Sequence, residues 1–237
     1  MATRTPATST EPRWIRVQAW LGGQWSFGNR RRAARLLYGF ARTEEQSQLE
    51  LRQAARACTD DRRRARYLRH ALDESRHAQV FAEHAQELAR AAGDLGFSRP
   101  TASSESLFEQ LGELRFLAFV HTGERRGRIE FETYARLLRR RGADGLASLF
   151  ESLVQDERHH EAYSARLLEE LAGAAGARSA VGWARRWEAW RGFRRRGRAL
   201  AGALYCATML LVYLVLAPFG LGVRLLSQPT RGFLREP

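Results

Sequence analysis

Glu74-Ser-Arg-His77 and Glu157-Arg-His-His160 are the two short stretches of sequence that decide the fold prediction. Each places a glutamate and a histidine three residues apart, so in a helix both side chains lie on one face and can reach one ion. One Glu-x-x-His pair arises by chance in many helical proteins. Two copies, each in the second helix of a predicted helical pair, indicate a repeated metal-binding unit.

Helical patterns of apolar residues extend in both directions from these two pairs. Ala, Leu, Arg and Glu dominate the composition, and all four favour helix, so we expect an all-α protein. A segment rich in Gly, Ser and Pro at residues 93–104 separates two halves, and residues 142–145 form a turn within the second half. Two antiparallel helix pairs joined by one longer crossover predict a four-helix bundle. The four predicted helices cover residues 29–58, 61–92, 107–141 and 146–171.

Each Glu-x-x-His pair needs a further carboxylate from the helix that precedes it. In two antiparallel helices, residues that lie level with each other are equally far from the connecting turn. The midpoint of Glu44 and Glu74 is position 59, inside the first predicted turn. The midpoint of Glu124 and Glu157 lies beside Arg141, at the second predicted turn. The spacing therefore predicts that both pairs lie level in the bundle.

All four glutamates lie on apolar stripes of their helices. A buried carboxylate without a partner is too costly to keep ionised, so cations must neutralise them. Mixed oxygen and nitrogen donors fit iron, with manganese as the alternative, better than zinc. Ser47 and Gly127, each three residues after a glutamate, leave room for ions or a bridging ligand. We predict two iron ions, held by Glu44, Glu74, His77, Glu124, Glu157 and His160.

Two further residues are candidates for supporting these ligands from outside. His121 lies three residues before Glu124 on the same face, and Tyr134 lies further along that face. The alternative interpretation of the whole set is an ordinary bundle rich in Arg and Glu, in which these residues form salt bridges at the surface.

The repeated pattern of a glutamate followed by Glu-x-x-His resembles the ferritin-like di-iron carboxylate superfamily, which includes rubrerythrins, bacterioferritins and demethoxyubiquinone hydroxylases. Residues 40–47, FARTEEQS, are similar to a rubrerythrin first-helix motif with one extra residue before the glutamate. Glu124, Gly127 and Phe131 follow the superfamily's spacing of glutamate, small residue and aromatic residue. The resemblance covers residues 30–172 and implies a ferritin-like four-helix bundle around a di-iron centre.

The resemblance does not extend to every member of that superfamily. The chain has two cysteines, Cys58 and Cys206, which cannot form the cysteine pairs of a rubredoxin-like domain. A complete rubrerythrin is therefore excluded. The glutamate at the first ligand position and the short chain disfavour a ribonucleotide reductase radical subunit.

The formal charge of +13 invites a nucleic-acid interpretation, but its distribution argues against one. Residues 1–40 carry +6, residues 41–170 carry −2 and residues 171–237 carry +9. A nucleic-acid-binding protein more often has a basic stripe on its folded domain. We therefore expect no nucleic-acid partner.

The C-terminal part has the pattern of a membrane anchor. Residues 183–198, WARRWEAWRGFRRRGR, place aromatic rings among arginines, as interfacial helices do. Residues 199–223 contain no charged residue and are long enough to cross a bilayer. The arginine-rich flank then puts the metal-binding domain on the cytoplasmic side. One alternative is a helix broken at Pro218, Gly220 and Gly222, which would give a monotopic hairpin or an in-plane anchor. Another is a helix buried in a homo-oligomer interface.

Residues 13–27 form an apolar, tryptophan-rich lead-in that either packs on the bundle or touches a membrane surface. The expected divisions of the chain are a tail and lead-in at 1–28, the bundle at 29–172, a basic aromatic helix at 177–198, a membrane segment at 199–223 and a tail at 224–237.

These features together lead to a functional expectation. We expect a membrane-anchored oxidoreductase that activates O₂ or peroxide at a di-iron centre and acts on an apolar substrate such as a quinone or lipid. The electron donor is left open. One alternative is a ferroxidase, or another protein of iron handling or peroxide detoxification, at the membrane. Another is a non-catalytic membrane scaffold with a degenerate site.

Overall fold

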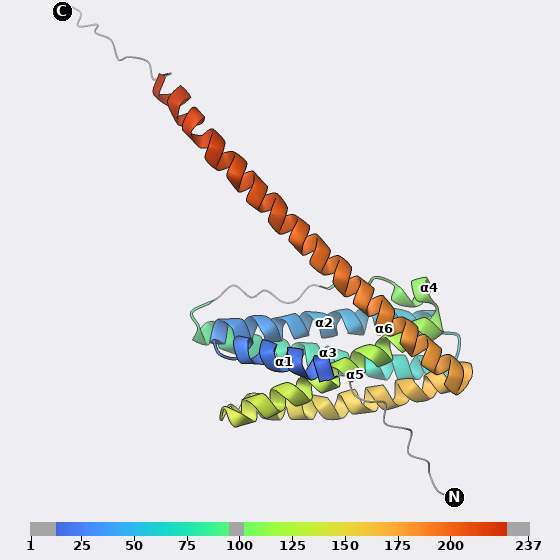
Figure 1. Ribbon diagram of the computed structural model, residues 1–237. Coiled ribbons are helices and arrows are strands. Elements are labelled where there is room, and N and C mark those ends of the chain that lie inside the picture. Colours follow the sequence, from blue (N-terminus) through green and yellow to red (C-terminus); the bar gives the residue numbers. More distant parts are fainter. Residues whose placement is uncertain (1–12, 95–101, 227–237) are drawn as a thin grey trace, which may run out of the picture. The chain divides into compact units, whose positions relative to one another are not determined.

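The structure, a computed structural model, describes residues 13–94 and 102–226, with side chains up to residue 219 (Figure 1). The predicted tails at 1–12 and 227–237 lie outside the described residues, as does part of the predicted crossover. The described part is all-α, as predicted. Its helices are α1 (Arg13–Ser26), α2 (Arg30–Ala57), α3 (Asp61–Ala91), α4 (Leu107–Leu111), α5 (Glu113–Arg140) and α6 (Asp144–Leu226).

Helices α2 and α3 form an antiparallel pair whose ends agree with the prediction. The Asn29 side chain accepts a hydrogen bond from the backbone N–H of Arg32 and caps the start of α2. Asp60 accepts from the backbone N–H of Arg63 at 2.8 Å and caps α3. The short connection between these helices contains Cys58, which ends α2 in extended conformation.

The predicted third helix, at 107–141, is divided in two. Gly112 has φ +72° and ψ 160°, which ends α4 after one turn and starts α5 in a new direction. A backbone with positive φ favours glycine because a Cβ atom would be strained there. The prediction of one continuous helix was wrong at this residue. Gly142, with φ +70°, follows the end of α5 and lies in the turn to α6, where the sequence predicted a turn.

Helix α6 runs far beyond the predicted end at residue 171. Only Gly173, with φ +65° and ψ 171°, departs from helical geometry, so the chain bends there and continues as helix. Ala177, Ala180 and Ala184 are buried after the bend. The guanidinium of Arg115 lies 5.0 Å from the centre of the Trp183 ring. The compact N-terminal unit therefore extends to Arg185, because this small-residue face of α6 packs on it.

Four long helical segments pack side by side in the N-terminal unit: α2, α3, α5 and the part of α6 before Gly173 (Figure 1). One end of this bundle is filled by an aromatic cluster that includes Phe40. The centres of the other four rings lie 5.2–6.3 Å from the centre of the Phe40 ring. Helix α1 contacts both α5 and α2, so the lead-in packs on the bundle. The other rings of the cluster are Phe81, Phe131, Tyr134 and Phe150.

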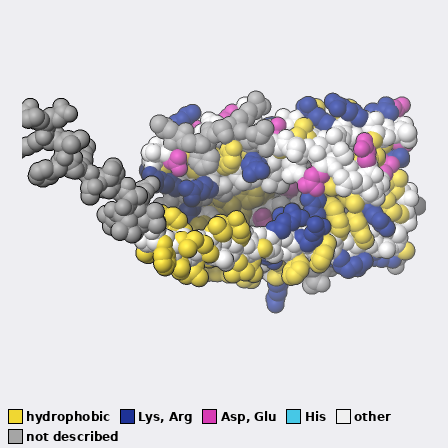
Figure 2. Space-filling view, turned by 90° about the horizontal axis from the view of Figure 1, so that it is seen from above, with side chains coloured by type: hydrophobic (Ala, Val, Ile, Leu, Met, Phe, Trp, Pro, Cys, Tyr) yellow, Lys and Arg dark blue, Asp and Glu magenta, His cyan; other side chains and the backbone are white. Residues whose placement is uncertain are grey.

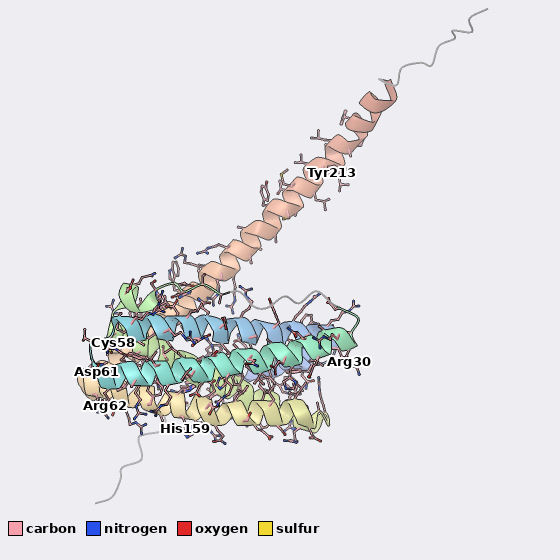
Figure 3. All side chains as sticks on the ribbon, turned by 180° about the vertical axis from the view of Figure 1, so that it is seen from behind. Arg30, Cys58, Asp61, Arg62, His159 and Tyr213 are labelled. Atoms are coloured by element: carbon pink, nitrogen blue, oxygen red, sulfur yellow. The ribbon has the colours of Figure 1, made fainter. Side chains whose placement is uncertain are left out.

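The second unit begins at Arg186 and holds the rest of α6. Among the described residues, α6 is the one helix that is long and apolar enough to cross a membrane, by length and composition alone. Tyr213 projects from its side (Figure 3), and Leu204 and Phe219 are likewise exposed. Figure 2 shows apolar side chains gathered in one area of the surface next to dark blue arginines. The helix continues through Pro218 without the break that a hairpin needs.

Candidate metal centre

The six predicted ligands converge inside the bundle from four helices. Each side chain is buried, and none of the six residues is more than 8% exposed. Their role as metal ligands stays a prediction, but the buried cluster of acids and histidines is able to hold metal ions. The contributions are Glu44 from α2, Glu74 and His77 from α3, Glu124 from α5, and Glu157 and His160 from α6.

The cluster divides into two groups of donor atoms that share one glutamate. The first consists of His70, Glu74, Glu124 and His160, and the second of Glu74, His77 and Glu157. Within each group, one donor atom of every residue lies within 4.8 Å of those of the others. Glu44 belongs to neither group, but it interacts electrostatically with members of both, including Glu74, His77 and Glu124. Two ions could therefore be held next to each other, with Glu74 between them.

The two predicted histidine ligands are oriented with one nitrogen toward the carboxylates. His160 Nδ1 lies 3.5 Å from Glu74 Oε1 and 3.5 Å from Glu124 Oε2. His77 Nδ1 lies 4.0 Å from Glu74 Oε1 and 3.9 Å from Glu157 Oε1. Both Nδ1 atoms are buried and have no hydrogen-bond partner among the described residues. A buried nitrogen without a partner is costly, and a cation between it and the carboxylates removes that cost.

The opposite nitrogen of each histidine is held by an aspartate. His77 Nε2 lies 3.1 Å from Asp156 Oδ2, and His160 Nε2 lies 3.2 Å from Asp73 Oδ2. An Nε2–H that donates to a carboxylate leaves the Nδ1 lone pair for a metal, which is the usual support of histidine ligands. With the hydrogen on Nε2, each histidine presents its Nδ1 lone pair to the carboxylates, which is the direction that a ligand requires.

These aspartates were missed in the sequence, although the motif contains them. Each half reads Asp-Glu-x-x-His, at 73–77 and 156–160. The aspartate of one motif supports the histidine of the other, so the support crosses between α3 and α6 in both directions. The repetition of Asp before Glu is the signal by which they could have been found.

His70 is a further member of the centre, in addition to the six predicted ligands. Its Nε2 lies 2.8 Å from Glu74 Oε1 and 3.4 Å from Glu124 Oε1, and the centre of its ring lies 3.7 Å from that of the tilted His160 ring. Its Nδ1 lies 2.6 Å from the Tyr163 hydroxyl. The consistent assignment has Tyr163 donating to Nδ1 and Nε2–H donating to Glu74. His70 lies one helical turn before Glu74, a spacing that was visible in the sequence.

The electrostatics of the cluster show that it lacks positive charge. Burial, followed by repulsion from neighbouring carboxylates, raises the pKa values of Glu74 and Glu157 well above the ordinary value. Burial also raises the pKa of Glu44. Burial alone would also raise the pKa of Glu124. The interactions of its carboxylate with His70 and His160 outweigh burial and lower the pKa. Two divalent ions would balance four ionised glutamates.

Gly127 provides space that a larger residue would take from the centre. A Cβ atom at this position would lie 3.1 Å from Glu157 Oε2, closer than an ordinary contact. The prediction that a small residue is needed here agrees with this geometry. The corresponding position on α2, Ser47, is partly buried.

The two residues predicted to support the ligands, His121 and Tyr134, contact other groups. His121 Nδ1 is 3.1 Å from Ser164 Oγ and 3.2 Å from the carbonyl oxygen of Glu161. Tyr134 belongs to the aromatic cluster, where its ring packs on Phe150. In the part of the chain that the structure describes, neither side chain is hydrogen-bonded to a predicted ligand. His159 is exposed on the outside of α6 (Figure 3).

Comparison of the chain with protein-family models, curated proteins and solved structures gives no match. The interpretation of the centre therefore depends on its own geometry.

Proposed function

We propose that the chain is a membrane-attached, ferritin-like di-iron protein, an oxidoreductase that reacts with O₂ or peroxide. The observation that carries the proposal is the pair of buried Nδ1 atoms, of His77 and His160, which face the carboxylates without a hydrogen-bond partner among the described residues. A surface salt-bridge network would have no reason to bury these atoms in this orientation.

The donor set supports iron, with manganese as the alternative. Four carboxylates and the two imidazoles of His77 and His160 are hard and borderline donors, and the described cluster contains no thiolate. Glu74 belongs to both groups of donors and would help to hold either ion. Two bound iron ions would supply two-electron redox chemistry with O₂ or peroxide.

The residues around the cluster would prepare it for that chemistry. Asp73 and Asp156 hold the histidine rings in position and fix which nitrogen faces inward. Phe81 and Leu37 are fully buried in the adjoining core, which helps to keep water from the centre. Gly127 leaves room for the carboxylate of Glu157.

The apolar part of α6 supports attachment to a membrane. Its length and composition suit a bilayer, and the arginines before residue 199 favour the cytoplasmic side for the N-terminal unit. An enzyme held at a bilayer has access to apolar substrates dissolved in it, such as quinones or lipids. This is the reason for preferring oxidation of such a substrate to iron storage.

Metal uptake by the full chain in detergent tests the proposal. After removal of metals, anaerobic addition of Fe(II) should load two ions per chain. Glu74→Ala and Glu157→Ala should each lose at least one ion. Glu132→Ala is the matched control, because Glu132 accepts hydrogen bonds from Arg128 and Arg158 and takes no part in the cluster.

Uptake that is absent, or that falls equally in the control, would show that the cluster is not a metal centre. Reaction type is tested next, by exposing the loaded protein in bilayers to O₂. A membrane oxidoreductase should consume O₂ faster when a quinol or an unsaturated lipid is present. Consumption that depends on Fe(II) alone would identify a ferroxidase instead.

A further inference from the structure

Helix α1 has one face fixed to the bundle. Ile15 and Ala19 are buried on that face, and Gly23 lies against α5. A Cβ atom on Gly23 would lie 2.8 Å from Leu137 Cδ2 and 3.0 Å from Tyr134, so the two helices approach as closely as a glycine allows. The rotation of α1 is therefore set by packing, and so is the direction in which its other face points.

The outward face of α1 is strongly apolar. Among the described residues of the N-terminal unit, five of the seven exposed large apolar side chains belong to this one helix, and the other two are Leu68 and Leu72 of α3. A contiguous apolar face of this kind marks a surface that contacts something other than water. The five are Trp14 (58% exposed), Val17 (55%), Trp20 (46%), Leu21 (57%) and Trp25 (65%).

A groove of about 410 Å³ lies between this helix and α5. Three arginines line it: Arg16 from α1, and Arg136 and Arg140 from α5. Its other lining residues are mainly apolar and include Trp20 and Leu137. Residues 13–40 contain no aspartate or glutamate, so α1 contributes only positive charge to the groove.

We propose that α1 lies in the headgroup layer of a bilayer and that this groove binds the phosphate of an anionic phospholipid. The guanidinium groups of Arg16, Arg136 and Arg140 suit a phosphate, which they can bind with paired hydrogen bonds. Trp20 and Leu137 suit the first part of an acyl chain. Tryptophan is enriched at membrane interfaces because its ring is apolar and its N–H is polar.

The alternative occupants fit these observations less well. A nucleic acid would use the arginines but gives no reason for five exposed apolar side chains. A protein partner would use the apolar face, but not a groove with arginine as its only charged residue type. The bilayer is also the one surface for which the chain has a second candidate contact, the apolar part of α6. The inference uses the membrane attachment proposed above, but not the metal chemistry.

The distribution of tryptophans allows a test on the full chain. Three of the six tryptophans, Trp14, Trp20 and Trp25, lie in α1, and the other three lie in residues 183–190. The triple variant W183F/W187F/W190F therefore leaves tryptophan emission from α1 alone. In bilayers that contain phosphatidylglycerol, lipids brominated on the acyl chain should quench this emission by roughly twofold. In bilayers of phosphatidylcholine alone the quenching should be weaker.

The complementary variant W14F/W20F/W25F reports on the C-terminal segment by the same measurement. If its emission is quenched while that of α1 is not, the α1 proposal is overturned and the membrane attachment stands. If neither is quenched, both fail. Circular dichroism of each variant, compared with the unmodified chain, shows whether the helices are retained.

The arginines are tested in the background that keeps only the α1 tryptophans. R16Q/R136Q/R140Q should reduce quenching in phosphatidylglycerol to its level in phosphatidylcholine. The control R62Q/R69Q/R166Q removes the same charge from exposed positions of α3 and α6, and it should keep the response to phosphatidylglycerol. Equal loss in both variants would overturn the phosphate site, as would binding of RNA that competes with phosphatidylglycerol vesicles.

Discussion

Replacement of Asp156 by asparagine separates the charge of this side chain from its shape. Asp156 Oδ2 lies 3.1 Å from His77 Nε2 and accepts a second hydrogen bond from Arg76 at 2.8 Å. Asparagine keeps an acceptor oxygen at nearly the same place, so the His77 ring should keep its orientation. What is lost is the negative charge that makes His77 a more basic ligand.

The size of the effect follows from these contacts. Loss of such a supporting carboxylate lowers metal affinity by about 10-fold to 100-fold, or about 1.4–2.8 kcal/mol. The Asp156 side chain is 31% exposed, so solvent screens part of its charge. We therefore expect Asp156→Asn to lower the affinity for the ion next to His77 by about 10-fold, the lower limit of this range.

The crossed arrangement makes the prediction specific. Asp73→Asn should lower the affinity for the ion next to His160, because Asp73 supports that histidine. The double variant should lower the affinity for both ions. Anaerobic titration of the metal-free full chain with Fe(II) or Mn(II) measures the two binding constants. Asp144→Asn is the control, because Asp144 pairs with Arg139 at the surface. The reasoning is refuted if Asp156→Asn changes neither constant, or if the control changes them as much.

Two further predictions concern the interior of the centre. Gly127→Ala should lower the affinity for at least one ion by about tenfold, because the new methyl group displaces the Glu157 carboxylate. Gly123→Ala in the same helix meets open space and should instead stabilise the chain by about 0.5–1 kcal/mol without changing metal affinity, as thermal unfolding and titration would show. The metal-free protein should lose stability as the pH rises above the ordinary glutamate pKa of 4.5, since the raised folded-state pKa values of Glu74 and Glu157 favour folding only while these groups stay protonated. Denaturant titrations should show this slope, bound metal should remove it, and a metal-free stability that rises over the same range would contradict it.

The ligand faces could be predicted because helical spacing is a local property. Glu74 and His77 must share a face whatever surrounds them, and the distance from the turn then placed Glu44 level with Glu74. The aspartate supports could not be derived in this way. Asp73 lies about 100° around the helix from Glu74, and its partner is His160 on α6. Which helix faces it depends on the rotation of α3 within the bundle, which local spacing does not determine.

The end of the last helix was mispredicted for a related reason. The bundle was predicted to end at residue 172, but only Gly173 leaves helical geometry and the helix continues beyond it. The alanines around this glycine favour helix strongly enough to continue it on both sides. Whether the continuing helix packs on the bundle depends on Ala177, Ala180 and Ala184 finding a partner surface, and this too is a property of the tertiary structure.

The exchange of aspartates between the two motifs has a consequence for how the centre is assembled. A fragment with α2 and α3 alone has Glu44, Glu74 and His77, but the carboxylate that orients its histidine belongs to the other half. The fragment with α5 and α6 has His160 but lacks Asp73, the carboxylate that orients it. Each hairpin is thus an incomplete half, and metal affinity should increase when complementary hairpins associate, within one chain or between two.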